Sequence, residues 1–278
     1  MNDRVYSRPD RGLVLAEGPR VVSELASLMA AAPFLYQAPR GDGHPVMVMP
    51  GYGADDRSTT VIRRFLSSKG YSTHPWNLGT NRGPAMPDLR DELARRLDGV
   101  FVDADKQTVS LVGWSLGGVY ARLLAHLYPN KVRQVITLGS PFAGSPRSTS
   151  VSPLVRARSA VPLEQRPSNR LRVLAGEPLP GIPSTAVFSK TDGIVPWQIA
   201  TQPTTDIAEN IEVYASHLGL GFNPAVLYAV ADRLANREGK WRPFERRGWK
   251  RFVYGPARLQ RDDWPSRDRA DATAATEH

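Results

Sequence analysis

The sequence predicts an α/β protein with a mostly parallel central sheet and helices on both faces of that sheet. Short apolar runs alternate along the chain with segments whose apolar residues recur at helical spacing. The apolar runs are nearly continuous, which is typical of strands buried on both faces of a parallel sheet. The composition agrees, because 41% of the 278 residues are hydrophobic and 23% are charged, as in ordinary soluble globular proteins.

Residues 1–40 are predicted to form a leader with one amphipathic helix. Apolar residues recur there at helical spacing, and Pro33 is expected to limit the helix downstream. The expected stripe consists of Val21, Val22, Leu25, Leu28 and Met29. The segment "MNDRVYSRPDRG" lacks an apolar core of the signal-peptide type, and no run of about 18 apolar residues occurs in the chain. We therefore expect a soluble, cytoplasmic protein without a transmembrane segment.

From Pro45 onward, strands and helices are predicted to alternate. The expected strands lie in "PVMVMPGYG" (45–53), where Pro50 and Gly51 end the run, the weaker "YSTHPWNLG" (71–79), "TVSLVGW" (108–114), "VRQVITLGS" (132–140), "STAVFS" (184–189) and "NIEVYA" (210–215). The expected helix stripes are Val61, Ile62, Phe65 and Leu66; Leu89, Leu93 and Leu97, with Pro87 near the first turn; Val119, Leu123, Leu124 and Leu127; and Val226, Leu227, Val230 and Leu234. Gly70 is expected to end the first of these helices. Asn223 and Pro224 are expected to begin the last helix, and Gly239 to end it.

The chain carries a net charge of +9 and contains no cysteine. Much of the positive charge falls in residues 147–172 and 237–269, and no recognised nucleic-acid motif accompanies either stretch. We interpret both stretches as solvated surface, with weak contact to an anionic surface as the alternative. The lack of cysteine excludes disulfides, a thiol nucleophile and zinc held by cysteine.

A candidate nucleophile stands between a predicted strand and a predicted helix. The run from Gly113 to Gly117, "GWSLG", fits G-x-S-x-G with Ser115 at its centre. A serine on so sharp a turn takes a strained backbone conformation, and larger side chains two positions away would collide. Gly118 lets the helix pack close to the sheet. The alternative is a glycine-rich turn with an incidental serine, and the strand–turn–helix context favours the nucleophile.

Five histidines could supply the base that Ser115 requires: His44, His74, His126, His217 and the terminal His278. His126 lies about three turns along the helix that follows Ser115, so we expect a structural role for it. His44 precedes the first core strand and starts at the far edge of the sheet, and His74 sits inside a strand-like run. His217 follows the last strand, at the carboxyl edge where catalytic groups gather in parallel sheets. We therefore predict His217 as the base.

Asp192 is the predicted partner of His217. It comes just past another strand end, in "SKTDGIVPW", and gives the chain order Ser, Asp, His. Asp206, Asp103 and Asp105 all precede strands and are expected at the opposite edge. The alternative for Asp192 is a plain turn aspartate in "TDG". The oxyanion of a tetrahedral intermediate also needs amide donors, for which we predict the backbone N–H groups of Leu116 and Tyr52.

The chain resembles the α/β-hydrolase superfamily on its lipase and esterase side. The resemblance rests on "VMVMPGYG", "GWSLGG", "TLGSPFAG", "SKTDGIVPW" and "SHLGLG", which span residues 45–236 in family order. It implies an eight-stranded type of sheet and an insertion after the sixth strand that acts as a lid. It also places the triad on Ser115, Asp192 and His217. The segment "WNLGTNRGP" is similar to family sequence near the cleft, but we assign no role to Asn77 or Arg82.

These observations predict a serine hydrolase of carboxylic esters that needs no metal or organic cofactor. Its expected substrate is a small-molecule or lipid-like ester, and no nucleic-acid partner is expected. The serine disfavours haloalkane-dehalogenase and epoxide-hydrolase chemistry, which uses a carboxylate nucleophile. Thioester hydrolysis or acyl transfer by the same triad is the first alternative. The second, of another class, is a non-catalytic module that binds anionic surfaces.

The predicted organisation has three parts. The leader covers residues 1–40 and the catalytic domain residues 41–240, with a lid-like Pro/Arg/Ser-rich insertion at 145–183. A basic, aromatic tail covers residues 241–278. We expect Trp241, Phe244 and Trp249 to pack back onto the domain, and the residues beyond about Arg261 to be disordered.

Overall fold

The computed structural model describes residues 6–86, 88–151 and 173–256. In these residues, six strands form one sheet in the order β2-β1-β3-β4-β5-β6. The strands are β1 (Pro45–Met49), β2 (Ser72–Pro75), β3 (Val109–Trp114), β4 (Val132–Leu138), β5 (Ser184–Phe188) and β6 (Ala208–Glu212). Every neighbouring pair is parallel, which confirms the predicted fold class. The eight strands implied by the resemblance are not reached in the described residues, because the chain before β1 forms helices.

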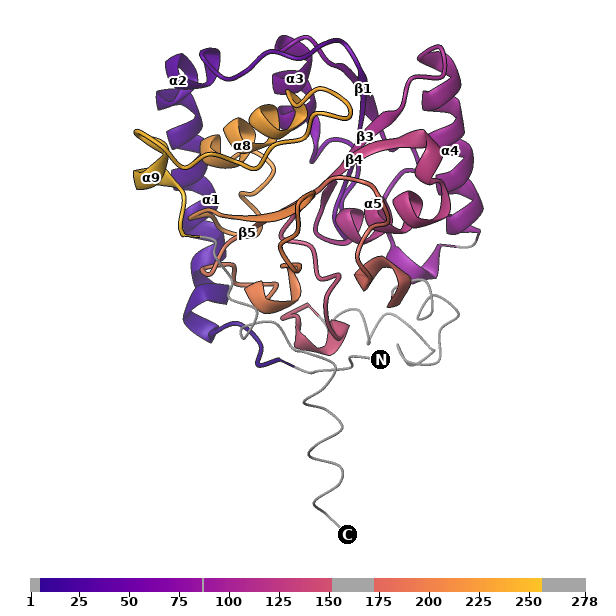
Figure 1. Ribbon diagram of the computed structural model, residues 1–278. Helices are drawn as coiled ribbons and strands as arrows, with labels where there is room; N and C mark the ends of the chain where they lie inside the picture. Colours follow the sequence, from indigo (N-terminus) through magenta and orange to yellow (C-terminus); the bar gives the residue numbers. More distant parts are fainter. Residues whose placement is uncertain (1–5, 87, 152–172, 257–278) are drawn as a thin grey trace.

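Helices cover both faces of this sheet (Figure 1). They are α1 (Arg11–Ala30), α2 (Ala32–Tyr36), α3 (Thr60–Ser68), α4 (Leu89–Asp103), α5 (Leu116–Leu127), α8 (Pro224–Leu234) and α9 (Lys250–Val253). Short 3-10 turns lie at Gly83–Ala85, Pro129–Lys131, Pro146–Ser148 and Trp197–Ile199. Residues of α3 and α8 pack on one face, together with α2, and residues of α4 and α5 pack on the other.

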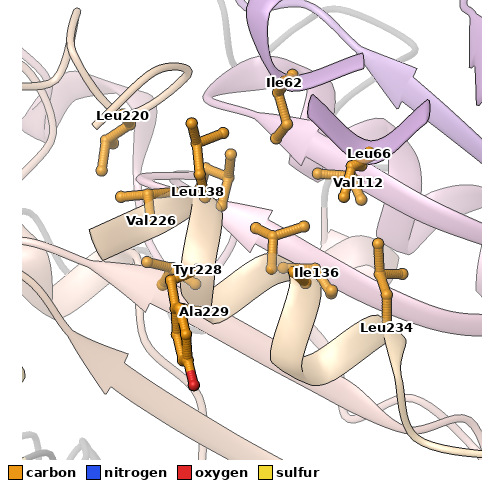
Figure 2. Packing of buried hydrophobic residues seen from close by; sticks show 14 of the residues in the cluster. Ile62, Leu66, Val112, Ile136, Leu138, Leu220, Val226, Tyr228, Ala229 and Leu234 are labelled. Carbon is orange, nitrogen blue, oxygen red and sulfur yellow. The ribbon is translucent and has the colours of Figure 1, made fainter. Parts of the chain in front are cut away.

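The two layers of core follow from the alternation of side chains along buried strands. Val46 and Val48 of β1 join the cluster beneath α3 and α8, whereas Met47 and Met49 join the cluster beneath α4 and α5. Figure 2 shows the first of these clusters, in which Val112 lies among side chains from both α3 and α8. Because both faces are covered, all five residues of β1 are buried, as its continuous apolar run predicts.

The predicted helices are confirmed with adjusted bounds. α4 has 15 residues and carries the leucine stripe expected for it. Asn223 caps α8, and its side chain accepts a hydrogen bond from Ala225 N at 3.0 Å. Gly70 directly follows the C-cap of α3 and takes the positive φ expected there. The prediction that Gly239 ends the last helix is wrong, because α8 ends at Leu234 with Ala235 as its C-cap and Gly239 lies in the turn that follows. The last strand begins two residues earlier than "NIEVYA" and ends at Glu212.

The buried side of α1 is not the side that the sequence predicts. Three of the stripe residues, Val22, Leu25 and Met29, are exposed by 70%, 52% and 78%. Glu17 and Glu24 are buried instead. The reason is that the inward side of α1 lies against loops that present backbone N–H groups, and carboxylates satisfy such donors where apolar side chains cannot. Pro33 does not simply end the helix, because it lies in the first turn of α2.

The described part of the tail packs against the domain. The Trp249 ring meets Phe34 and Tyr228 edge-on, and Phe244 packs against the core cluster beneath α3 and α8. The prediction is thus confirmed for Phe244 and Trp249, and Trp241 is half-buried. The centre of the predicted lid, residues 152–172, lies outside the described residues, as does everything beyond residue 256.

Candidate active site

Ser115 occupies a strained turn between β3 and α5. Its backbone has φ 54° and ψ −122°, a region that residues with a side chain rarely adopt. A Cβ at Gly113 would lie 2.3 Å from Gly118 Cα, and one at Gly117 would lie 2.4 Å from Met49 O. Only glycine fits at either position. The turn therefore holds the serine side chain clear of the strand and at the start of a helix.

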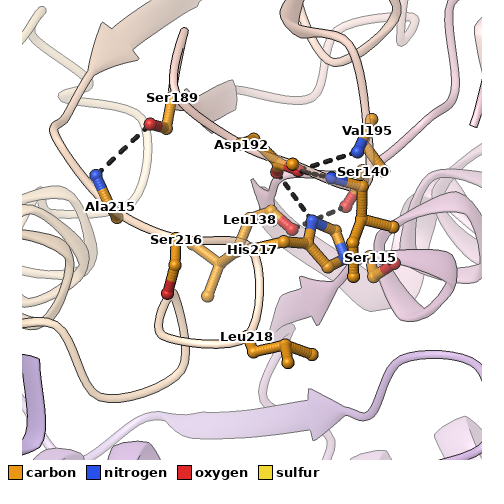
Figure 3. Close-up of polar contacts among 12 residues, drawn as sticks. Ser115, Leu138, Ser140, Ser189, Asp192, Val195, Ala215, Ser216, His217 and Leu218 are labelled. Atoms are coloured by element: carbon orange, nitrogen blue, oxygen red, sulfur yellow. Dashed lines mark hydrogen bonds and ion pairs between the residues drawn. The ribbon is translucent and has the colours of Figure 1, made fainter. Parts of the chain in front are cut away.

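The serine, the histidine and the aspartate predicted from the sequence lie in one hydrogen-bonded row (Figure 3). His217 Nε2 is 3.0 Å from Ser115 Oγ, and His217 Nδ1 is 2.6 Å from Asp192 Oδ2. Both His217 and Asp192 are buried, and Ser115 is half-buried. Each residue follows a different strand at the carboxyl edge: β3, β5 and β6 respectively for Ser115, Asp192 and His217.

Asp192 is fixed by its own loop. Its Oδ1 accepts hydrogen bonds from Ile194 N at 2.8 Å and Val195 N at 2.7 Å, which leaves Oδ2 for the histidine. A carboxylate held in this way orients the imidazole so that Nε2 faces the serine. The Trp114 indole also donates to the backbone carbonyl of His217 at 3.1 Å, which ties the histidine loop to the nucleophile strand.

The pKa of His217 lies above its ordinary value, although the ring is buried. Burial opposes the charged form, but the negative charge and hydrogen bond of Asp192 outweigh it, and the charge of Glu17 adds to them. Asp192 and Glu17 therefore make the imidazolium form less unfavourable than it is in a free histidine, and imidazolium is the form that His217 would take on accepting a proton from Ser115.

The loop after β1, which carries the predicted oxyanion donor Tyr52, lies close to Ser115. A Cβ at Gly51 would lie 3.1 Å from Ser115 Cβ, so the two backbones are in close contact. Neither the Tyr52 N–H nor the Leu116 N–H donates a hydrogen bond to an acceptor within the described ranges. Both N–H groups are therefore available to a bound group.

Asn81 fixes this loop and was missed in the sequence. Its side-chain amide donates to Pro50 O at 2.9 Å, and its side-chain oxygen accepts from Gly83 N at 3.0 Å. Its backbone bonds to the same loop, with Gly53 N donating to Asn81 O at 2.7 Å and Asn81 N donating to Ala54 O at 2.8 Å. The sequence signal was the segment "WNLGTNRGP", in which Asn81 stands beside Arg82.

Glu17 and Glu24 were also missed, because an acidic residue on a helix is ordinarily solvated. Their seven-residue spacing, which puts both on one side of α1, was the available signal. Both carboxylates accept backbone N–H groups from the loop that carries His217.

The other candidate residues lie away from this row. His126 Nε2 contacts Glu177 O at 3.1 Å, in line with the structural role expected for it. His74 is on β2 and contacts Ser72 Oγ at 3.1 Å. His44 precedes β1 and is buried at the opposite edge of the sheet, and His278 lies outside the described residues. Asp103 and Asp105 precede β3 and Asp206 precedes β6, so all three are at the amino edge of the sheet.

No group of histidine, aspartate and glutamate side chains suited to a metal ion occurs in residues 6–86, 88–151 and 173–256. In the same ranges, no helix has the length and apolar character needed to span a bilayer.

Comparison with known proteins bears on the fold. A family model described as alpha/beta hydrolase fold matches residues 66–175. The chain therefore has the α/β-hydrolase fold, and by distant homology it is lipase- and esterase-like. A triacylglycerol lipase of Burkholderia plantarii is 31% identical over 127 residues, which make up 43% of this chain and 35% of the lipase. The chain thus matches about a third of that relative's length.

Solved structures also resemble the chain. Lipase B of Aspergillus fumigatus superposes with a TM-score of 0.55 at 16% identity, over 72% of this chain and 54% of that one. Lipase BlEst2 of Bacillus licheniformis, in its mature form, has a TM-score of 0.48 at 16% identity, over 70% of this chain and 92% of that one.

Proposed function

We propose that the protein is a serine hydrolase that cleaves carboxylic esters through an acyl-enzyme. Ser115 Oγ attacks the ester carbonyl while His217 Nε2 takes the serine proton, and the Asp192 carboxylate stabilises the resulting imidazolium. The N–H groups of Leu116 and Tyr52 bind the oxyanion. His217 then gives its proton to the departing alkoxide, and the alcohol leaves. Water deacylates the enzyme by the same cycle, with His217 as base and Ser115 as leaving group.

The observation that carries the proposal is the row Ser115 Oγ–His217 Nε2–Asp192 Oδ2, with separations of 3.0 and 2.6 Å. A nucleophile and base within hydrogen-bond reach, with the base oriented by a third group, is the arrangement that activates a serine. The strained backbone of Ser115 adds support, because strain of this kind is retained where the turn serves a function.

The substrate class rests on the relatives rather than on a measured ligand. The partial match to a triacylglycerol lipase supports an ester of lipid-like or small-molecule type. Leu218, next to His217 in the sequence, is 45% exposed and offers an apolar surface beside the row (Figure 3). Thioester hydrolysis and acyl transfer use the same chemistry, and the test below compares esters with matched thioesters.

A non-catalytic module that binds anionic surfaces would need free cations in the basic tail, and two of the tail's cations are already bonded to other groups of the protein. Arg246 donates to Tyr254 O at 2.9 Å, and Lys250 donates to Asp232 at 2.8 Å. Arg247, in contrast, is largely exposed. The contacts of Arg246 and Lys250 therefore favour a role in packing the tail against the domain over a role in binding an anion.

A fluorophosphonate probe, followed by turnover of acyl esters of increasing chain length and of matched acyl thioesters, tests the proposal. We expect labelling of Ser115, ester turnover, and loss of both in Ser115→Ala. Ser110→Ala is the matched control, because Ser110 is the other serine of this strand–turn region that contacts a histidine. An unlabelled wild-type protein that turns over no ester or thioester would overturn the assignment. Faster turnover of thioesters than of esters would favour thioester hydrolysis as the function instead.

A further inference from the structure

The inward side of α1 contacts both loops that carry the proposed base and its carboxylate. Glu17, Arg20 and Glu24 recur at positions i, i+3 and i+7, so they share one side of the helix. Glu17 and Glu24 are 4% and 7% exposed. Buried carboxylates are costly unless they accept several hydrogen bonds, and both of these do.

Glu17 joins the two loops directly. Its Oε1 accepts from Gly193 N at 2.8 Å and from His217 N at 2.9 Å, and its Oε2 accepts from Leu218 N at 3.0 Å. Gly193 follows Asp192 in the chain, so one carboxylate group fixes the backbone on both sides of the Asp192–His217 contact. The fit is close, because a Cβ at Gly193 would lie 2.5 Å from Leu13 O of α1.

The two neighbours on α1 complete this attachment. Glu24 accepts from Ser216 N at 2.6 Å and from Ser216 Oγ at 3.0 Å, one residue before the histidine. Arg20 donates to Thr191 O at 2.5 Å and Thr191 Oγ1 at 2.9 Å, one residue before the aspartate. The residues that flank Asp192 and His217 on both sides in the sequence are therefore bound to a single helix.

We propose that Glu17 is a positioning residue for His217, with Glu24 as its support, and that α1 is part of the catalytic apparatus. The inference rests on the function proposed above. Glu17 sets the distance between the two loops, and its charge stabilises the imidazolium that forms when Ser115 is activated. The charged groups beside the His217 loop are Glu17, Arg20 and Glu24 from α1, and Asp192 from the loop after β5.

The test is Glu17→Gln, which keeps the size of the side chain but removes its charge and replaces one acceptor by a donor that faces Leu218 N. We expect kcat to fall about 10- to 100-fold with little change in KM, because ground-state binding does not use this residue. We also expect the acid limb of the kcat/KM profile to move to lower pH, since the imidazolium loses a stabilising charge. Glu24→Gln should lower kcat less, because Glu24 does not contact His217 itself.

Glu209→Gln is the matched control, since Glu209 is another buried glutamate that accepts a backbone N–H, from Phe244, but lies away from the site. It should lower stability without moving the pH profile. An imidazole titration of His217 by NMR gives a readout that does not depend on turnover. If Glu17→Gln leaves both the titration and kcat unchanged, the inference is wrong. If the wild type hydrolyses no ester while the titration still shifts, the proposed function fails and the Glu17 contact stands.

Discussion

His44 Nε2 lies 2.8 Å from Ser110 Oγ, and His44 Nδ1 bonds to Asp42, so the protein contains a second serine–histidine–aspartate row. This row sits at the amino edge of the sheet, where Ser110 is fully buried in β3. Burial lowers the pKa of His44 despite its contact with Asp42, whereas the pKa of His217 is raised. Residue types and distances alone therefore do not identify a nucleophile. The proposal favours Ser115 because it lies on a strained turn, is only half-buried, and is close to two N–H groups that have no acceptor in the described part of the chain.

The two serines should respond differently to removal of their hydroxyl groups. Ser115→Ala should lower kcat by at least about 10,000-fold and leave the fold intact, because its hydroxyl is used in chemistry. Ser110→Ala should leave probe labelling unchanged but lower the free energy of unfolding by about 1–3 kcal/mol, since it leaves the buried His44 nitrogen without its partner. Urea denaturation and active-site labelling measure the two effects. Equal labelling of both variants would contradict the assignment of Ser115.

Activity should fall on the acid side with a midpoint above the ordinary histidine value of about 6.5. Burial disfavours the charge on His217, but Asp192 and Glu17 together raise its pKa. His217 must be neutral to accept the serine proton, so protonation as the pH falls through that raised pKa removes the base. The measurement is kcat/KM against pH with a short-chain ester. An acid limb centred below the ordinary value would show that the carboxylates do not act as described.

The sequence predicted the fold and the Ser115–His217–Asp192 row because each of these leaves a local signal. Continuous apolar runs marked the strands, and chain order together with strand ends marked Asp192 and His217. Glu17 left only the weak signal of its seven-residue spacing from Glu24, because its role depends on where α1 docks, and its partners are backbone N–H groups of residues 193, 217 and 218. The same holds for Asn81, which bonds to backbone atoms of the loop after β1. Contacts between a side chain and a distant backbone cannot be inferred from residue types.

Asn81 should affect catalysis through the loop that it holds. Asn81→Ala removes the hydrogen bonds to Pro50 O and from Gly83 N. We expect kcat to fall about 10- to 100-fold, because the Tyr52 amide moves away from the developing oxyanion. Asn77→Gly is the control from the same segment, since Asn77 is exposed and has a φ of 62° that glycine adopts without strain. Steady-state kinetics of the two variants decide the matter, and similar kcat values would contradict this role.

The buried ion pair between Arg233 and Glu209 should contribute strongly to stability. Its Nη1–Oε1 separation is 2.9 Å, and Glu209 also accepts from Phe244 N at 2.7 Å. Arg233→Met leaves the Glu209 charge buried without a cation, which should lower the free energy of unfolding by about 3 kcal/mol. Arg247→Met is the control, because Arg247 is 87% exposed on its side chain and its pairing with Glu245 is screened by water. Chemical denaturation that gives equal midpoints for the two variants would contradict the role of the pair.

Two glycines in helices should respond in opposite directions to alanine. A Cβ at Gly118 in α5 would lie 2.0 Å from Ser140 Oγ and 2.9 Å from Gly113 O, so Gly118→Ala must push the helix away from the nucleophile strand. We expect it to lower stability by about 1–3 kcal/mol and to reduce labelling of Ser115, because the turn is displaced. A Cβ at Gly99 in α4 meets nothing within 4 Å.

Gly99→Ala should therefore raise stability by about 0.5–1 kcal/mol and leave labelling unchanged, since only backbone entropy is altered. Thermal unfolding and the rate of probe labelling, measured on both variants, distinguish the effect of a steric clash at Gly118 from the effect of helix propensity at Gly99. A Gly118→Ala variant with wild-type stability and labelling would show that α5 does not need to approach β3 as closely as the structure indicates, and the steric account of the Ser115 turn would be wrong.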